Sequence, residues 1–190
     1  MEIIAITGLK RSGKDTICDY LVDKYGFQKL SFAGPLKDAC KAIFKFSDEQ
    51  LYGDEEKEKI DPRWDISPRK ALQYVGTEMF RDMMGNIIQN LDKDIWLKCM
   101  EISIEECKNS KIVINDCRFE NEIDFIIKKM NGTVHRVMRT NNTNINVNNN
   151  DIHSSEQNIM NFTINGKEII NNGTLNELYE KIDNLFDNKK

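Results

Sequence analysis

The sequence lacks the features of a membrane-bound or exported protein. None of its 190 residues belongs to an apolar run that approaches the roughly 18 residues of a membrane helix. The start, MEIIAITG, has neither the basic first residues nor the long apolar segment of a signal peptide. We therefore expect a soluble protein of the cytoplasm that has no membrane partner.

Paired cysteines and an excess of positive charge are missing as well. The five cysteines form no C-x-x-C pair and have no histidine nearby at the spacing of zinc ligands, so we expect reduced thiols. The net charge is −4 at pH 7, which argues against a generally basic surface for nucleic acid polymers. Any nucleic acid chemistry should therefore concern small nucleotides.

What the sequence does contain is an alternation of strand and helix patterns. Apolar, β-branched runs predict buried strands at 2–7, 28–32, 111–116 and 133–138, with a weaker strand at 161–164. Helical patterns begin near residues 14, 35 and 68 and cover 94–107, 121–130 and 175–186. This order predicts an α/β fold, a single domain over 1–190 with a central parallel sheet of about five strands and helices on both faces.

Two polar segments interrupt the alternation. Residues 47–67 are highly charged, which is more typical of an exposed or mobile excursion than of a core. Residues 140–158 are rich in asparagine and too polar for a core, so the simplest interpretation is a low-complexity surface loop. Long loops in compact domains also serve as lids, which makes the ends of this segment candidates for ligand contact.

A glycine loop follows the first predicted strand. The stretch from Gly8 to Lys14, GLKRSGK, fits the G-x-x-x-x-G-K pattern. In that pattern backbone amides, a helix N-terminus and one lysine hold a chain of phosphates. Because the loop lies between a predicted buried strand and a predicted helix, it indicates a nucleotide-phosphate site.

The residue after the loop, Asp15, stands where the pattern requires a hydroxyl. A carboxylate about 4 Å from a phosphate charge would cost about 4 kcal/mol at an effective dielectric constant of about 20, so a positive charge must stand between them. We expect Mg²⁺ in that role, with Asp15 holding a metal-bound water and Thr16 supplying a hydroxyl to the metal or a phosphate. The alternative is that Asp15 only interacts with the helix dipole.

Polar residues that follow two other strands are candidates for a second, acceptor site. Lys37, in SFAGPLKDA, suits the phosphate of an acceptor, although it could also be a solvated helix lysine. Asp116 and Arg118, in INDCRFENEID, follow a buried strand, and ligands bind at the carboxyl edge of such sheets. Asp116 would orient Mg²⁺ or the attacking phosphate and Arg118 would neutralise the transferring group, unless the two form a plain surface ion pair.

The helix after Pro68 carries a further set of polar residues in SPRKALQYVGTEMFRD. Arg69 suits a phosphate, and Gln73 and Thr77 suit a base edge. Gly76 suggests close approach by another group, because a glycine in mid-helix costs about 1 kcal/mol relative to alanine. The alternative is a structural helix with an arginine at its start.

The ends of the asparagine-rich segment also carry candidate ligands. Arg136 and Arg139 stand before it, and His153 and Glu156 lie near its end, as expected for a closing lid. An isolated His153 would more often be an ordinary loop histidine. No nucleophile paired with a base stands out, and phosphoryl transfer needs none because its catalysis is mostly positioning and charge neutralisation.

Five of these motifs occur in one order: GLKRSGKDT, FAGPLKDA, LQYVGTE, DCRFENE and H-x-S-E, from Ile6 to about Glu156. Together they resemble the deoxynucleoside monophosphate kinases of phages and large viruses, a branch of the P-loop nucleoside monophosphate kinases. The resemblance implies a P-loop kinase fold with a helical acceptor-binding insertion at about 34–100 and a lid loop at 140–158. It also implies transfer of the ATP γ-phosphate to a dNMP in dNTP precursor synthesis, a need for Mg²⁺, and a tendency toward homodimers.

With this resemblance, the candidate residues fall into three groups. We expect ATP to be bound by Gly8, Lys10, Arg11, Ser12, Gly13, Lys14, Asp15 and Thr16, of which Asp15 and Thr16 would serve the metal. We expect the acceptor site to be lined or supported by Lys37, Arg69, Gln73, Gly76, Thr77, Trp96, Asp116, Arg118, Glu122, His153 and Glu156. We expect Lys14, Asp116, Arg118 and Arg139 to be catalytic.

Two alternatives remain open. Animal-type phosphomevalonate kinases have a similar K-x-S-G-K-D loop, G-P-L-K turn and D-x-R strand end, although the LQYVGTE helix favours a nucleotide acceptor. A P-loop switch without an acceptor would leave the polar acceptor-side residues without a purpose, and the sequence has no N-K-x-D motif for guanine. The chain departs from the phage pattern in the short segment before Arg69 and in the asparagine-rich tract.

Overall fold

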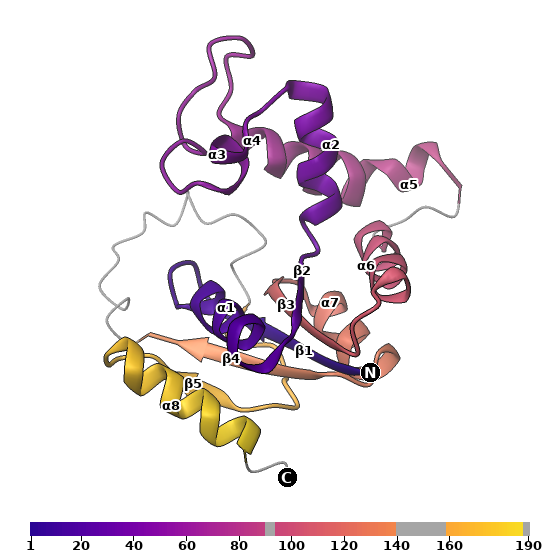
Figure 1. Ribbon diagram of the computed structural model, residues 1–190. Coiled ribbons are helices and arrows are strands. Elements are labelled where there is room, and N and C mark those ends of the chain that lie inside the picture. The colour runs from indigo at the N-terminus through magenta and orange to yellow at the C-terminus, as the bar shows by residue number, and fades with distance from the viewer. Residues whose placement is uncertain (90–93, 140–158, 188–190) are drawn as a thin grey trace. The chain divides into compact units, whose positions relative to one another are not determined.

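A parallel sheet with its helices and a purely helical region form two separate units in the computed structural model (Figure 1). The first unit consists of Met1–Ser31 and Glu106–Lys190, and the second of Phe32–Glu105. The structure describes residues 1–89, 94–139 and 159–187. The expected single domain over 1–190 stays a prediction.

The sheet of the first unit has the strand order β2-β3-β1-β4-β5, and every neighbouring pair is parallel. The strands are β1 (Glu2–Thr7), β2 (Gln28–Leu30), β3 (Lys111–Cys117), β4 (Thr133–Met138) and β5 (Glu168–Ile170). The central strand β1 is the most apolar and lies between β3 and β4. All carboxyl ends therefore meet at one edge, which is where ligands bind in such sheets.

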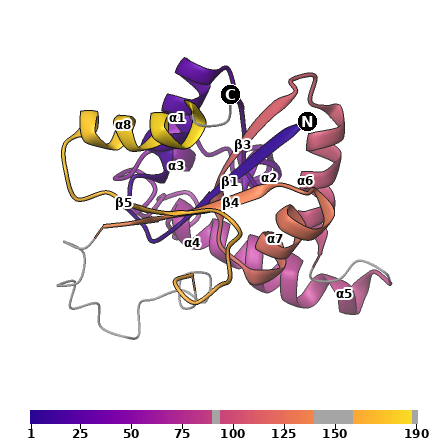
Figure 2. The same ribbon diagram turned by 90° about the horizontal axis from the view of Figure 1, so that it is seen from below.

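Helices cover both faces of this sheet, as Figure 2 shows. Helices α1 (Lys14–Tyr25) and α8 (Leu175–Phe186) lie on one face, and α7 (Glu120–Asp124) with the π-helical η2 (Phe125–Lys129) lies on the other. On the α1 and α8 face the core consists of strand residues and helix residues, Ile4, Ile6, Val113, Val137 and Ile169 with Ile17, Leu21, Leu178 and Ile182. The predicted α/β fold, with a central parallel sheet of five strands and helices on both faces, is confirmed.

The second unit, which lies between β2 and β3 in the chain, is helical. It contains α2 (Gly34–Phe44), α3 (Asp48–Tyr52), α4 (Pro68–Gln73), the π-helical η1 (Tyr74–Met83), α5 (Met84–Ile87) and α6 (Ile95–Glu106). Ser67 caps α4 by accepting a hydrogen bond from the Lys70 amide, and Pro68 occupies the first position. The expected helical insertion is thus present.

The strand predicted at 161–164 was wrong, since β5 begins at Glu168. The stretch before it runs beside β4 without forming a ladder, because the Asn165 side chain accepts the hydrogen bond of the Val134 amide. Gly166 then donates to the Val134 carbonyl, and a Cβ at this glycine would lie 2.4 Å from the same oxygen. Only after this close approach does the chain enter the sheet.

The charged segment at 47–67 is mostly exposed, as expected, but it is anchored at two buried positions. Leu51 on α3 is 1% exposed and Asp61 is 3% exposed. The Asp61 carboxylate accepts hydrogen bonds from Arg63 and Gln50, and these hold its pKa well below the usual value. The segment is therefore fixed to its unit despite its polarity.

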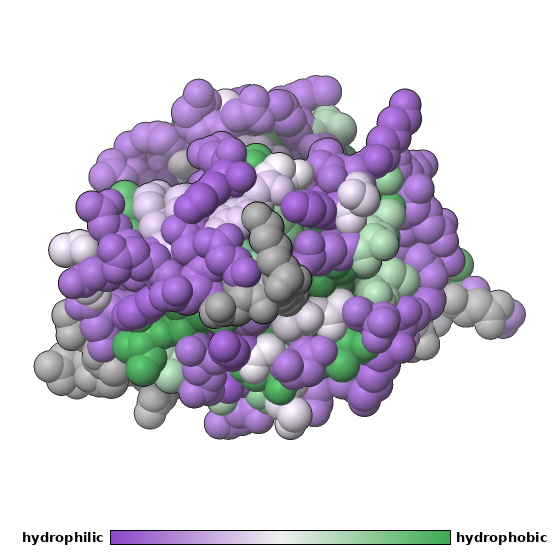
Figure 3. All heavy atoms as spheres, turned by 60° about the horizontal axis from the view of Figure 1, so that its bottom comes forward, coloured by the Kyte–Doolittle hydropathy of each residue, from purple (hydrophilic) through white to green (hydrophobic). Residues whose placement is uncertain are grey.

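Hydrophilic residues predominate on the face shown in Figure 3, in line with a chain in which 31% of the residues are charged. Within the described residues, no helix combines the length and the apolar character needed to cross a membrane. All five cysteines are free, and Cys18, Cys40 and Cys117 are buried.

Candidate active site

The glycine loop has a backbone that only glycine tolerates at its two ends. Gly8 and Gly13 have φ values of 143° and 104°, in the region that side chains disfavour. A Cβ at Gly8 would lie 2.4 Å from the Val137 carbonyl oxygen, and one at Gly13 would lie 2.4 Å from Asn171 Nδ2. The loop therefore passes tightly between β4 and the residue after β5 before it enters α1.

A hollow of about 380 Å³ opens beside this loop. Its lining comes from the glycine loop and α1, from the end of β4, from the segment between β5 and α8, and from α8 itself: Arg11, Gly13, Lys14, Asp15, Thr16, Arg139, Asn171, Gly173, Leu175 and Leu178. The Lys14 ammonium donates to the carbonyl oxygens of Gly8 at 2.9 Å and Leu9 at 2.7 Å. The hollow thus combines cations at the N-terminus of a 12-residue helix with the apolar side chains of Leu175 and Leu178.

Asp15 lies in the first turn of α1 and its carboxylate is held from two strands. Asn115 on β3 donates its Nδ2 to Asp15 Oδ1, and Lys29 Nζ on β2 lies 3.2 Å from the same oxygen. Burial alone would raise the pKa of Asp15, but the Asn115 hydrogen bond and the Lys29 charge outweigh it, so that the pKa is lowered. Asp15 is therefore an anion at neutral pH.

Lys29 connects two carboxylates of the same helix. Its Nζ lies 2.9 Å from Asp19 Oδ1, one turn beyond Asp15. Burial would lower the pKa of Lys29, but the Asp19 hydrogen bond and the Asp15 charge more than compensate, and the pKa is raised. A fixed positive charge thus stands beside the first turns of α1.

Asn171 ties the C-terminal part of the chain to the glycine loop. Its Nδ2 donates to the Ser12 carbonyl at 2.9 Å, and its own amide donates to the Met138 carbonyl at 2.7 Å. Ser12 itself is 1% exposed, so it shapes the loop from inside rather than meeting solvent. The conformation of the loop therefore depends on a residue far away in the sequence.

The end of β3 presents the predicted pair Asp116 and Arg118. Ser31 donates its hydroxyl to Asp116 Oδ2 at 2.7 Å, which fixes this carboxylate. Thr7, at the end of β1, donates its hydroxyl to the Cys117 carbonyl at 2.8 Å, so the neighbouring strand ends are joined. Asp116 is thus oriented at the carboxyl edge of the sheet.

Glu122 has a structural function in this turn. The residue is 2% exposed, and its Oε2 accepts hydrogen bonds from the backbone amides of Arg118 at 2.8 Å and Phe119 at 3.1 Å. A carboxylate in that position satisfies the first amides of α7 and interacts favourably with the helix N-terminus. Glu122 therefore supports the placement of Arg118, and its role at an acceptor site stays a prediction.

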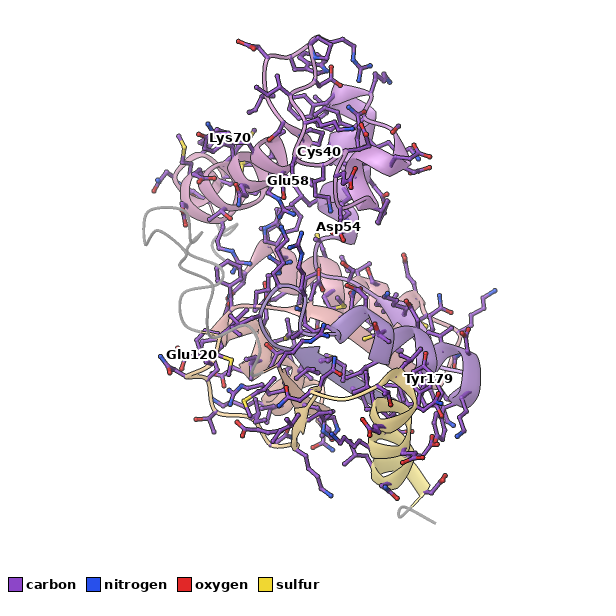
Figure 4. The ribbon with its side chains drawn as sticks, turned by 90° about the vertical axis from the view of Figure 1, so that its left-hand side faces the viewer. Cys40, Asp54, Glu58, Lys70, Glu120 and Tyr179 are labelled. Carbon is purple, nitrogen blue, oxygen red and sulfur yellow. The ribbon has the colours of Figure 1, made fainter. Side chains whose placement is uncertain are left out.

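In the second unit, two predicted phosphate-binding cations contact neighbouring side chains. The Lys37 ammonium lies 4.1 Å from the centre of the Tyr52 ring. Arg69 forms a salt bridge from Nε to Glu58 Oε1, and its amide donates to the Lys57 carbonyl at 2.9 Å. Figure 4 shows Glu58 in the loop before α4. An acceptor phosphate at Arg69 would have to compete with this carboxylate.

Gly76 and Trp96 pack inside the same unit. A Cβ at Gly76 would lie 2.5 Å from Leu36 Cδ2, so the close approach that the sequence suggested is made by α2. The Trp96 indole, 7% exposed, donates to the Gly76 carbonyl at 2.8 Å. The described contacts of both residues are therefore packing contacts, and Gln73 and Thr77 are half-buried on the same continuous helix.

The structure brings together only part of the predicted site. Arg139 lines the hollow with Arg11, Gly13, Lys14, Asp15 and Thr16, while Lys10 is exposed on the loop. The acceptor candidates are divided, because Lys37, Arg69, Gln73, Gly76, Thr77 and Trp96 belong to the second unit and Asp116, Arg118 and Glu122 to the first. His153, Glu156 and the expected lid at 140–158 lie outside the described residues.

Sequence reasoning missed several residues of the hollow and its surroundings. Asn171 and Gly173 were hidden because the last strand was predicted too early, so the segment at 171–174 did not appear as a strand end at the carboxyl edge. Leu175 belongs to the helix that was predicted at 175–186. Asn115 stood directly before Asp116 and could have been found as the end of the same strand. Lys29 carried no signal beyond its place in a short strand.

The chain matches the family model described as deoxynucleotide monophosphate kinase over residues 2–61 and 53–182. A relative from Acanthamoeba polyphaga mimivirus, whose name assigns it to the same family, is 40% identical over 194 residues, which cover 99% of this chain and 97% of that protein. The deoxynucleotide monophosphate kinase of Enterobacteria phage T4 is 24% identical over 259 residues, which cover 98% of this chain and 99% of that protein.

Among solved structures, the crystal structure of TT1252 from Thermus thermophilus is similar in fold. The comparison covers 100% of this chain and 98% of that chain, with a TM-score of 0.53 and 13% sequence identity. At this level of identity the similarity concerns the fold alone. The family assignment therefore depends on the sequence matches, and the fold comparison agrees with the observed sheet.

Proposed function

The chain belongs to the deoxynucleotide monophosphate kinase family, and we propose that it transfers the γ-phosphate of ATP to a deoxynucleoside monophosphate, giving ADP and a dNDP. The observation that carries this proposal is the hollow in which the glycine loop, Lys14 and Arg139 surround the N-terminus of α1. A helix N-terminus with inward amides and nearby cations suits a chain of phosphates. The reaction would supply a precursor for dNTP synthesis.

We assign the ATP phosphates to the loop side of the hollow. Gly8, Ser12 and Gly13 shape the loop, Lys10 and Arg11 add positive charge, and Lys14 would exchange its carbonyl partners for phosphate oxygens. The adenine base would lie toward Leu175 and Gly173, where the wall is apolar and small. This orientation leaves the γ-phosphate near Arg139.

Mg²⁺ is the proposed cofactor, and the side chains present fit it. Thr16 and Asp15 line the hollow, and Asp116 is held in orientation by Ser31 at the neighbouring strand end. In the described residues no three carboxylate, cysteine or histidine side chains form a metal cluster of their own. Mg²⁺ is usually held by one or two protein oxygens together with substrate phosphates and waters, and it neutralises phosphate charge.

We propose that the acceptor is bound by the polar residues of the second unit. Lys37 and Arg69 would bind its phosphate, and Gln73 and Thr77 would face the base. Trp96 and Gly76 would support that helix through their hydrogen bond. His153 and Glu156 remain proposed acceptor ligands from the lid region.

Catalysis in this proposal is positioning and charge neutralisation. Lys14, Arg118 and Arg139 would stabilise negative charge on the transferring phosphoryl group, and Asp116 would orient the attacking phosphate. Glu122 supports Arg118 through the backbone bonds described above. No covalent intermediate on the protein is required, because the acceptor phosphate oxygen is itself the nucleophile.

A substrate panel tests the activity. The protein with Mg-ATP should release ADP, in a coupled assay, only when a suitable monophosphate is added from among dTMP, dGMP, dCMP, dAMP and their ribose forms. Mevalonate 5-phosphate is included because the phosphomevalonate kinases share three of the motifs. Activity on mevalonate 5-phosphate alone would refute the nucleotide assignment.

The proposed setting is the cytoplasm of a host cell, where the enzyme would act on free nucleotides and not on nucleic acid polymers. This agrees with relatives from a mimivirus and a phage and with a net charge of −4. We further propose a homodimer. Light scattering after size exclusion would give the mass in solution, to be compared with 22.1 kDa for one chain.

A further inference from the structure

Asp15 places a negative charge where the proposed function requires the phosphates of ATP. It lines the same hollow as Lys14 and Arg11, and its side chain is 71% exposed. The Asp15 carboxylate and the phosphates carry charges of the same sign and repel each other. Because the carboxylate is only partly solvated, water and salt screen this repulsion only in part. A nucleotide site built around Asp15 therefore needs a compensating positive charge that is present before any metal or nucleotide arrives.

Lys29 supplies such a charge from outside the glycine loop. Its Nζ lies 3.2 Å from Asp15 Oδ1 and 2.9 Å from Asp19 Oδ1, so one ammonium forms salt bridges with two carboxylates of α1. Its side chain is 32% exposed, which limits its freedom to move away. Lys29 comes from β2 and is not among the residues that line the hollow, so its described contacts with the first turns of α1 are those with the two carboxylates.

Asn115 fixes the direction of the Asp15 carboxylate. It donates Nδ2 to Asp15 Oδ1, the same oxygen that Lys29 contacts. Both groups come from strands, β2 and β3, which pair with each other in parallel. The carboxylate is therefore held from the sheet side by a donor and a cation on rigid elements.

We propose that Lys29 is a positioning residue for ATP binding, which neutralises Asp15 and, with Asn115, holds its carboxylate toward the sheet so that the triphosphate can occupy the glycine loop. This inference rests on the proposed function in one respect, namely that ATP binds at this loop. It assigns to a lysine of β2 part of the charge compensation that we had expected from Mg²⁺ alone. Nucleotide binding in the absence of metal should therefore already depend on Lys29.

The decisive experiment measures the binding of ADP by calorimetry, with EDTA and separately with Mg²⁺. Lys29→Met should weaken ADP binding in EDTA about tenfold, which corresponds to about 1.4 kcal/mol. Lys29→Arg keeps the charge and should bind within about threefold of the wild type. The defect of Lys29→Met should shrink as the salt concentration rises, because exposed charges are screened.

The double variant Lys29→Met with Asp15→Asn separates charge compensation from a folding defect. In EDTA, where the metal role proposed for Asp15 plays no part, removing the carboxylate that Lys29 neutralises should raise the affinity for ADP about threefold or more above that of Lys29→Met. A merely structural role of Lys29 would not be rescued in this way. Lys24→Met is the matched control, because Lys24 also lies on this unit and pairs with Asp183, 2.7 Å away, but does not line the hollow.

The possible results distinguish a failure of the role proposed for Lys29 from a failure of the proposed kinase activity. Wild-type affinity in Lys29→Met, or no recovery in the double variant, would overturn the role of Lys29 while leaving the kinase proposal intact. A wild-type protein that binds neither ADP nor ATP would instead refute the proposed function. The KM for the monophosphate acceptor should stay unchanged in Lys29→Met, and an equal rise in both KM values would also contradict the inference.

Discussion

Replacing Gly76 by alanine tests whether packing inside the second unit is what requires a glycine there. The three atoms nearest to an ideal Cβ at this position all belong to Leu36, the closest at 2.5 Å. Leu36 would have to leave its rotamer or the helices would have to separate, and such overpacking costs about 1–3 kcal/mol. Loss of a mid-helix glycine contributes about 1 kcal/mol in the opposite direction. The net expectation for Gly76→Ala is a free energy of unfolding lowered by about 1 kcal/mol.

The effect of Gly76→Ala on the free energy of unfolding should change sign when Leu36 is shortened to alanine. In a Leu36→Ala background the added methyl group meets open space, so only helix propensity remains and Gly76→Ala should raise the free energy of unfolding by about 1 kcal/mol. The resulting coupling of about 2 kcal/mol is in the range of residues in direct contact.

Urea unfolding of the four proteins, followed by tryptophan fluorescence, gives this cycle directly. Equal effects of Gly76→Ala in both backgrounds would refute the packing explanation. Unchanged stability together with a large rise in the KM for the monophosphate would place a ligand at Gly76 instead.

Three further changes test the proposed sites. Lys14→Ala should abolish phosphoryl transfer while leaving the thermal melting curve unchanged. Turnover at the wild-type rate in this variant would refute the assignment of the ATP phosphates to the glycine loop. Glu58→Gln should lower the KM for the monophosphate about twofold to fivefold, since an exposed ion pair is worth about 0.2–1 kcal/mol. The control Glu56→Gln, in the same loop, should leave this KM unchanged. A raised KM in Glu58→Gln would mean that Glu58 helps the acceptor to bind. Asn171→Ala should weaken ADP binding about fivefold, because a hydrogen bond to the loop is worth about 1 kcal/mol, and unaltered binding would show that the loop keeps its shape alone.

The glycine loop could be predicted from the sequence because its determinants are local. The strand before it, the glycines and the helix after it are adjacent in the sequence, and the structure has the strand at Glu2–Thr7 and the helix at Lys14–Tyr25. The order of strands and helices likewise predicted the parallel sheet. Local patterns of this kind predict the fold because each segment by itself favours the same secondary structure that it has in the folded protein.

The other parts depend on contacts between distant segments, which no local pattern reveals. The sequence showed that Gly76 needed a close neighbour but not that Leu36 would be that neighbour. The sequence showed that Asp15 needs a positive charge nearby, but not that Lys29 of β2 would lie beside it. The last strand was misplaced because a side chain, Asn165, accepts a hydrogen bond where a backbone carbonyl would continue the ladder.

The link between Asn171 and Ser12 also has a consequence for the time course of synthesis. The two residues are 159 positions apart, and β1 pairs only with strands that are made much later. At translation rates of about 5–20 residues per second, the glycine loop waits about 10–30 seconds for the residue that holds it. A ribosome-bound chain therefore leaves its earliest apolar strand unpaired until β3 and β4 have been made, and the contact that holds the glycine loop forms later still.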